Sequence, residues 1–241
     1  MNTPNLTLSA STATDLLRQL AAIDITVPLV TEGRTKEHRE QFMMARFLST
    51  KANAAELQFP LSISHSDGPD FILRLGPREA GIECVEAVPR ELYEIEILRE
   101  NEYPDSMNFG QKFVPGERNF TREEKDQIAS GQLAGPPWMP EAAKRNWVAA
   151  MKHCIEGKVR KLRKGNYSSM QTMWLLVQDE WPNTIQYYPE HQLAAATQLA
   201  AKLAPESSQQ SFAFIFIASG SSLLSISGAD ATTQPIHNLW A

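Results

Sequence analysis

One stretch decides the organisation of this chain: Gly68-Pro69-Asp70-Phe71-Ile72-Leu73-Arg74-Leu75, then a short turn, then Gly81-Ile82-Glu83-Cys84-Val85-Glu86. The two apolar runs flank residues 76–80, which are rich in turn formers, so the pattern predicts a β-hairpin. Pairing of its strands can bring Asp70 and Glu83 together. Neighbouring carboxylates repel each other unless a cation lies between them, and an all-oxygen site of this kind suits Mg²⁺ or Mn²⁺.

Both acids also have a purely structural interpretation. Asp70 could be a turn residue after Pro69, and Glu83 could face solvent or pair with an arginine. The metal site is favoured because Glu83 is embedded in the apolar sequence Ile82-Glu83-Cys84-Val85. A buried carboxylate is costly and usually has a partner or a metal.

The same residues carry a family resemblance. Pro69-Asp70, followed by Glu83 on a second strand, resembles the PD-(D/E)xK nuclease superfamily, whose motif is Pro-Asp and, further along the chain, Asp/Glu-x-Lys. The position of the motif lysine holds Val85, and Glu86 follows it. With its supporting elements the resemblance covers roughly residues 35–220. It implies a restriction-endonuclease-like fold, and Asp70 and Glu83 as catalytic ligands of one divalent ion, together with the main-chain carbonyl of Cys84.

The missing lysine has a candidate replacement. In some members of the superfamily it comes from the helix after the third strand, and the resemblance then assigns it to Lys158 or Lys161. Lys158 is preferred because it lies deeper in the predicted helix. Its side chain reaches roughly 6 Å, far enough for an ammonium to stabilise charge on an attacked phosphate. For each lysine alone, a plain surface position remains the alternative.

Further acids lie near the predicted site. Glu37 or Glu40, on the helix before the first strand, could reach the metal or could belong to a solvated charged face. Glu86 points away from Glu83 in a regular strand and joins the site only if the strand bends or ends at Val85. His65 is expected to be exposed and is left out of the mechanism.

Composition narrows the class of protein. A chain of 241 residues with 42% hydrophobic content can build a substantial core. The sequence shows neither an apolar run of membrane-spanning length nor a signal peptide, so we expect a soluble, cytoplasmic protein without a membrane partner. Cys84 and Cys154 are expected to be reduced core thiols. The formal charge of −5 argues against an overall basic coat but allows a local basic groove.

Residues 141–164 are the best candidate for that groove. Apolar residues repeat there at helical spacing, and from residue 144 to 164 there are eight Lys or Arg but one acid. The charge could neutralise phosphates or complement the negative end of the helix dipole. The predicted nucleic-acid-binding residues are Lys152, Lys158, Lys161 and Lys164, and DNA is favoured over RNA. The oligomeric state is left open.

The remaining periodicity gives the order of elements. It predicts helices over 33–50, 89–105, 141–164 and 190–203, and strands over 57–64, 173–179, 212–218 and 222–227 in addition to the hairpin. We therefore expect an α/β fold with a central mixed sheet flanked by helices, a restriction-endonuclease-like αβββαβ core with insertions, and a C-terminal helix-strand extension. The expected division is an N-terminal segment (1–34, loose up to about 13), one domain (35–228, with an irregular insertion at about 103–140) and a C-terminal tail (229–241).

Three functions compete at this stage. The first is a divalent-metal-dependent nuclease that hydrolyses phosphodiester bonds of DNA or RNA. The second is a catalytically degenerate nuclease fold that binds nucleic acid or a protein, which the valine at position 85 favours. The third is an α/β protein of unrelated function, in which Asp70 and Glu83 lie far apart.

Overall fold

The structure is a computed structural model, which describes residues 5–106, 113–117, 120–135, 139–165, 170, 172–183, 185, 189–204 and 211–240. Within these ranges no helix has the length and apolar character needed to cross a bilayer.

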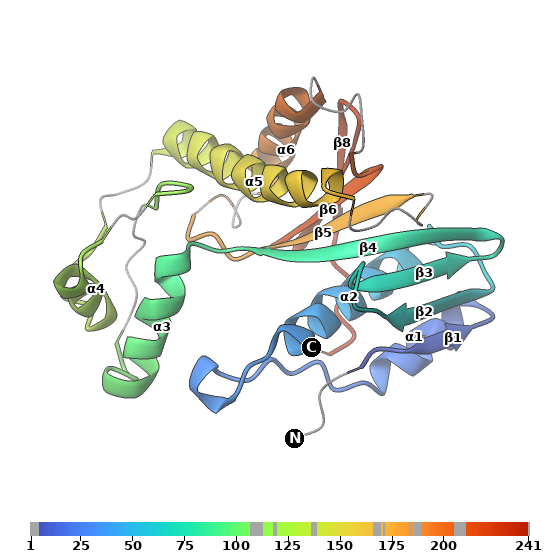
Figure 1. The fold of residues 1–241 in the computed structure, drawn as a ribbon, viewed down its shortest axis with the longest axis horizontal. Coiled ribbons are helices and arrows are strands. Elements are labelled where there is room, and N and C mark those ends of the chain that lie inside the picture. The colour runs from blue at the N-terminus through green and yellow to red at the C-terminus, as the bar shows by residue number, and fades with distance from the viewer. Residues whose placement is uncertain are drawn as a thin grey trace.

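A mixed eight-stranded sheet forms the centre of the molecule (Figure 1). The strands are β1 (Leu8–Ala10), β2 (Leu61–His65), β3 (Phe71–Leu75), β4 (Arg78–Ala87), β5 (Met173–Asp179), β6 (Phe214–Ser219), β7 (Ser222–Ser227) and β8 (Asp230–Pro235). They lie side by side in chain order. The pairs from β1 to β4 are antiparallel, β4–β5 and β5–β6 are parallel, and the pairs from β6 to β8 are antiparallel again.

Helices cover both faces of the sheet. They are α1 (Ala13–Ala21), α2 (Lys36–Asn53), α3 (Arg90–Glu102), α4 (Arg122–Ala129), α5 (Pro140–Arg163) and α6 (Pro189–Leu203), with a short 3₁₀ turn at Val30–Glu32. In Figure 1, α5 and α6 lie on one side of the sheet and α1 and α2 on the other, while α3 and α4 extend beyond one end. The predicted α/β class with a mixed sheet flanked by helices is confirmed.

Two apolar cores, one on each face, decide which way the residues of β4 point. Ile82 and Cys84 belong to the core under α1 and α2, whereas Val85 and Ala87 contact the core under α5 and α6. Side chains alternate along a strand. Glu83 is therefore directed toward α5.

The predicted hairpin is confirmed as β3 and β4, and Gly81 explains its close packing. Phe71 pairs with Ile82 and Leu75 with Arg78. A Cβ atom at Gly81 would collide with the side chains of Pro69 and Met173. The absence of a side chain there lets the Pro69-Asp70 segment lie directly against β4.

Both ends of the chain differ from the expectation. The N-terminal residues were expected to be loose, but β1 pairs with β2, with Leu8 opposite Ile63. The tail was expected beyond residue 228, but β8 pairs with β7, and the Trp240 indole donates to the Ile23 carbonyl at 3.0 Å. β1 has three residues, too few to show an alternating pattern, and β8 is polar with no buried residue, so neither carries a strand signal in the sequence.

The insertion at about 103–140 is partly described. It contains α4, which begins with a capping box: the Thr121 amide donates to the Glu124 carboxylate at 2.7 Å, and the Glu124 amide donates to the Thr121 hydroxyl at 3.2 Å. Lys125 of α4 pairs with Glu94 of α3. Glu91 of α3 is buried and accepts a hydrogen bond from the Phe120 amide.

A buried acid joins α5 to the sheet. Asp179, at the end of β5, accepts hydrogen bonds from the Trp147 indole at 2.7 Å and the Ser219 hydroxyl at 2.6 Å. Burial nevertheless raises the pKa of Asp179 to about 6, from an ordinary value of 3.8. The hydrogen bonds oppose this shift without cancelling it.

This raised pKa predicts a pH-dependent stability. The folded state holds the Asp179 proton more tightly than the unfolded chain does. The stabilisation that the protonated Asp179 contributes to the fold is therefore fully present below about pH 4 and is lost as pH rises through about 6. The unfolding free energy of the wild type minus that of Asp179→Asn should fall by about 3 kcal/mol over this interval in denaturant titrations. The exposed Asp105→Asn is the matched control, and an equal slope in both variants would contradict the assignment.

Candidate functional site

The hairpin brings Asp70 to β4 beside Glu83. Asp70 directly precedes β3, and continuing the Phe71–Ile82 register places it opposite Glu83. The Cys84 amide donates to Asp70 Oδ2 at 2.7 Å. The acids are 4% and 3% exposed, respectively. Asp70, just before β3, and Glu83, on β4, are thus both buried, and Asp70 is hydrogen-bonded to the residue that follows Glu83.

Lys158 of α5 reaches this site. Its Nζ lies 2.6 Å from Glu83 Oε2, and its side chain is 14% exposed. Val85 faces the same side of β4 as Glu83 because it is two residues further along the strand, and it packs against the core under α5. The ammonium therefore approaches from the face that a lysine at position 85 would also occupy.

The other predicted lysines lie elsewhere. Lys161 and Lys164 are exposed near the end of α5, and Lys152 pairs with Glu156 on the same helix. Of the two lysines predicted for catalysis, Lys158 is the one that contacts Glu83.

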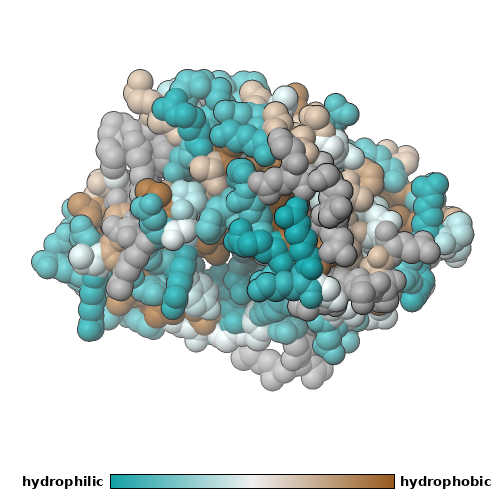
Figure 2. All heavy atoms as spheres, turned by 45° about the horizontal axis from the view of Figure 1, so that its top comes forward, coloured by the Kyte–Doolittle hydropathy of each residue, from teal (hydrophilic) through white to brown (hydrophobic). Residues whose placement is uncertain are grey.

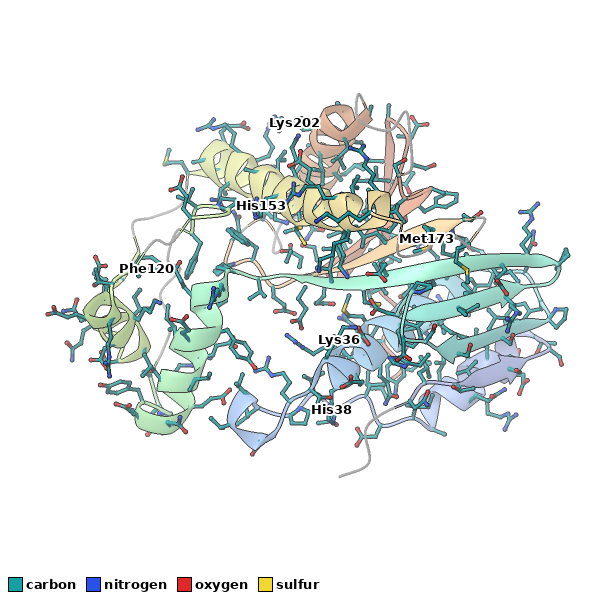
Figure 3. The ribbon with its side chains drawn as sticks, in the orientation of Figure 1. Lys36, His38, Phe120, His153, Met173 and Lys202 are labelled. Atoms are coloured by element: carbon teal, nitrogen blue, oxygen red, sulfur yellow. The ribbon has the colours of Figure 1, made fainter. Side chains whose placement is uncertain are left out.

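The first turns of α2 complete the charged cluster. Lys36 Nζ lies 2.6 Å from both Asp70 Oδ1 and Glu40 Oε1, so it joins the two carboxylates. The His65 ring nitrogen Nε2 lies 3.2 Å from Glu40 Oε2, and the ring packs edge-on against Phe71. The expectation that His65 is simply exposed is wrong. Figure 3 shows Lys36 on the side of the sheet that α2 covers.

The two acids that contact Lys36, Glu40 and Asp70, have pKa values shifted in opposite directions. Burial and the nearby charge of Asp70 raise the pKa of Glu40, although Lys36 lowers it. Burial also acts on Asp70, but hydrogen bonds from Lys36 and the Cys84 amide outweigh it, and the charge of Lys158 adds to them, so the pKa of Asp70 is lowered. Asp70 is therefore held as a carboxylate. The pKa of Lys36 is raised because its two acidic partners outweigh its partial burial.

Two acids considered in the sequence lie outside this cluster. Glu86 pairs with Arg39 of α2, as expected for a residue that points away from Glu83 in a regular strand. Burial raises its pKa, with Arg39 opposing the shift. Glu37 hydrogen-bonds its own backbone and Thr35 at the start of α2, which lowers its pKa. Neither contacts Asp70 or Glu83 in the interactions that the structure shows.

The donor set fits a hard divalent cation. In the described part of the chain, no three His, Cys, Asp or Glu side chains converge as a metal cluster. Mg²⁺ needs no such cage, since it commonly binds one or two carboxylates and otherwise water and substrate phosphates. The ammonium of Lys36 lies on the carboxylates of Asp70 and Glu40, so a metal ion bound at Asp70 would have to displace it. The Cys84 carbonyl as a further ligand stays a prediction.

Sequence reasoning missed Lys36 and His65 and left Glu40 open. A signal for Glu40 was present: it shares one face of α2 with Met44 and Phe47, at spacings of four and seven residues, and both of these are buried. An acid in an apolar stripe indicates a buried partner.

Hydrophilic side chains gather in the middle of the face turned toward the viewer in Figure 2.

Comparisons with family models, with curated protein sequences and with solved structures find no match to this chain. The geometry of the site is therefore the basis for a functional proposal.

Proposed function

We propose that this protein is a divalent-metal-dependent nuclease that hydrolyses phosphodiester bonds, with Asp70 and Glu83 as ligands of Mg²⁺ or Mn²⁺. The observation that carries the proposal is the contact of Lys158 with Glu83 at 2.6 Å. It places an amine beside the second acid on the face where the motif lysine of the PD-(D/E)xK superfamily would lie. The contact supports the proposal because the family resemblance predicted it for this lysine.

The order and direction of the elements support the same family. α2 is followed by the antiparallel strands β2, β3 and β4, then by α5 and by β5, which is parallel to β4. This is the order and direction that a restriction-endonuclease-like αβββαβ core would have, which supports the proposed family. β1 and α1 would be N-terminal additions, α3 and α4 an insertion, and α6 to β8 the C-terminal extension.

Asp70, Lys158 and Lys36 would have different roles in the proposed reaction. A bound metal would acidify a water molecule and polarise a phosphodiester oxygen. Asp70 is kept ionised by Lys36 and the Cys84 amide, so it is ready to bind a cation at neutral pH. Lys158 would stabilise negative charge that develops on the attacked phosphate. Lys36, whose side chain is 61% exposed, can move away from the carboxylates into solvent.

The proposed partner is nucleic acid, with DNA favoured over RNA. Lys152 and Lys158 are engaged in ion pairs within the protein, so Lys161 and Lys164 are the better candidates for phosphate contacts. The cysteines Cys84 and Cys154 are free, which is compatible with the proposed cytoplasmic location.

One observation favours a second candidate, a degenerate nuclease fold that binds nucleic acid without cutting it. Lysine ammonium groups already neutralise both predicted metal ligands. If these ion pairs are permanent, the site is a structural charge cluster and no metal enters.

A cleavage assay separates the two candidates. Purified protein is incubated with supercoiled plasmid, single-stranded DNA and RNA in Mg²⁺, Mn²⁺ or EDTA. The nuclease proposal predicts cutting of at least one substrate that depends on the metal. Binding without cutting, weakened by Lys161→Glu and Lys164→Glu and strengthened at low salt, would support the binding module instead. Cutting that continues in EDTA would contradict both.

A further inference from the structure

The eight-stranded sheet has one long open edge. β8 pairs with β7, and within the described residues no strand pairs with its other side. The opposite edge of the sheet is β1, which has three residues. β8 has six residues and no lysine, and its central residues Thr232 and Thr233 are exposed. An open edge of this kind is a template for a further strand.

The direction of the free backbone groups of β8 follows from its pairing with β7. The Ile236 N–H donates to the Ser221 carbonyl at 2.8 Å, so it points toward β7. Backbone groups alternate in direction along a strand of an antiparallel pair. The N–H and C=O groups of Ala231 and Thr233 therefore point to the open edge. Pro235 occupies the next outward position, where its missing N–H breaks no bond to β7.

The helix α6 runs beside this edge. It packs on β7 and β8, with α5 next to it (Figure 1). His191 interacts electrostatically with Glu141 at the start of α5. Leu193 lies two residues further along, so it points to nearly the opposite side of α6, and it is 37% exposed. Thr197 and Ala201 are exposed and continue this face at helical spacing. The face is therefore turned away from α5, toward the edge.

Together these elements form an uncharged surface, called the α6–β8 surface below. Residues 192–201 of α6 and 231–235 of β8 contain no Asp, Glu, Lys or Arg, although 21% of the whole chain is charged. Charged residues are depleted at the centre of protein interfaces. Nucleic acid would need cations here, and a charged peptide would find no opposite charge. A second copy of this chain brings no like charge against the surface.

A two-fold axis would fit a second copy to both elements at once. Antiparallel pairing of β8 with itself places the two strands roughly 4.8 Å apart. α6 lies over β7 and β8, so its axis is about half a strand spacing inside β8, and the two α6 helices come roughly 10 Å apart. Packed helices are usually about 8–10 Å apart. The same rotation therefore continues the sheet and packs two helices.

We propose that this protein forms a two-fold symmetric dimer, in which β8 pairs antiparallel with β8 of a second copy and α6 packs on its counterpart. A strand edge alone falls short of the roughly 1,000 Å² that a specific interface needs, and the helix face adds to it. We expect a reversible dimer with a dissociation constant of about 1–100 µM, because this interface is at the small end of the range. The inference holds whether or not the protein cuts nucleic acid.

Sedimentation equilibrium of the full-length protein, from well below to well above this dissociation constant, tests the proposal. The mass should rise from 27.0 kDa to twice that value. Thr197→Lys sets like charges against each other across the axis and should weaken the dimer about tenfold or more. Thr7→Lys is the matched control: Thr7 is exposed beside β1, at the other edge of the sheet, and the variant should dimerise like the wild type.

Two cysteine variants test the pairing of β8. Both outward N–H groups reach carbonyls of the second β8 only when the axis passes through Thr232 or through Thr233. The Cα atom on the axis lies about 4.5–5.5 Å from its counterpart, within disulfide range, but that of the neighbouring residue lies roughly 8 Å away. Oxidation should therefore link either Thr232→Cys or Thr233→Cys into a covalent dimer, but not both. The wild type, with free Cys84 and Cys154, gives the background.

A mass that stays at 27.0 kDa at all concentrations would overturn the proposal. A mass that grows beyond the dimer would also overturn it, because it would indicate open-ended pairing. Cross-linking of neither cysteine variant, or equally of both, would contradict the two-fold pairing, as would a Thr197→Lys variant that dimerises like the wild type. All measurements are made in EDTA without nucleic acid, so the dimer and the nuclease proposal can fail separately.

Discussion

Asp70→Asn is expected to abolish metal-dependent cleavage, with a loss of about 10³-fold or more. The amide keeps the size of the carboxylate and can still accept the Cys84 amide proton, but it removes the negative charge that binds the metal. The loss corresponds to several kcal/mol of stabilisation by a bound metal. The measurements are the cleavage rate with Mn²⁺ and, separately, Mn²⁺ binding by calorimetry.

Asp67→Asn is the matched control for this variant. Asp67 lies three residues earlier, in the same loop, and is exposed. It should cut and bind Mn²⁺ like the wild type. Equal cleavage by Asp70→Asn and Asp67→Asn would exclude Asp70 as a metal ligand, even if both proteins remained folded.

The second large effect is expected for Lys158→Met, which keeps the aliphatic stem but removes the ammonium. Cleavage should fall about 10²–10³-fold, because the charge on the attacked phosphate loses its cation. The unfolding free energy should fall by about 3 kcal/mol, since Glu83 remains buried without its partner. Lys161→Met, one turn further along α5 and exposed, should change the unfolding free energy by less than about 0.5 kcal/mol.

A compensating substitution separates the catalytic from the structural role of Lys158. Val85→Lys introduces an amine two residues after Glu83 on the same face of β4. In the Lys158→Met background it should restore at least a tenth of the wild-type cleavage rate. Recovery of stability without recovery of cleavage would show that the amine serves only to neutralise Glu83.

Helices and strands whose apolar residues repeat at a regular spacing were predictable from the sequence. The run from Met173 to Asp179 was expected as a buried strand and is β5 with those bounds. α5 was predicted over 141–164 and spans Pro140–Arg163, because its apolar stripe and its initial proline are local signals. β1 and β8 were missed because pairing with a neighbouring strand, which no local pattern encodes, holds them in the sheet.

The site was predictable only in part, for a related reason. Asp70 and Glu83 come from one hairpin, so their proximity follows from local pairing. Contact with Lys158 required a helix far along the chain and was suggested by the family resemblance rather than by the residues. Lys36 remained undetected because an exposed lysine at the start of a helix resembles any other until α2 is packed against the hairpin.

The most direct measurement is the anomalous difference density of a crystal of the protein soaked in Mn²⁺. The account predicts one peak bonded to carboxylate oxygens of both Asp70 and Glu83, with the ammonium of Lys36 moved off Asp70 and that of Lys158 still beside the site. A map without a peak there, in which Lys36 and Lys158 keep their present ion pairs, would contradict it.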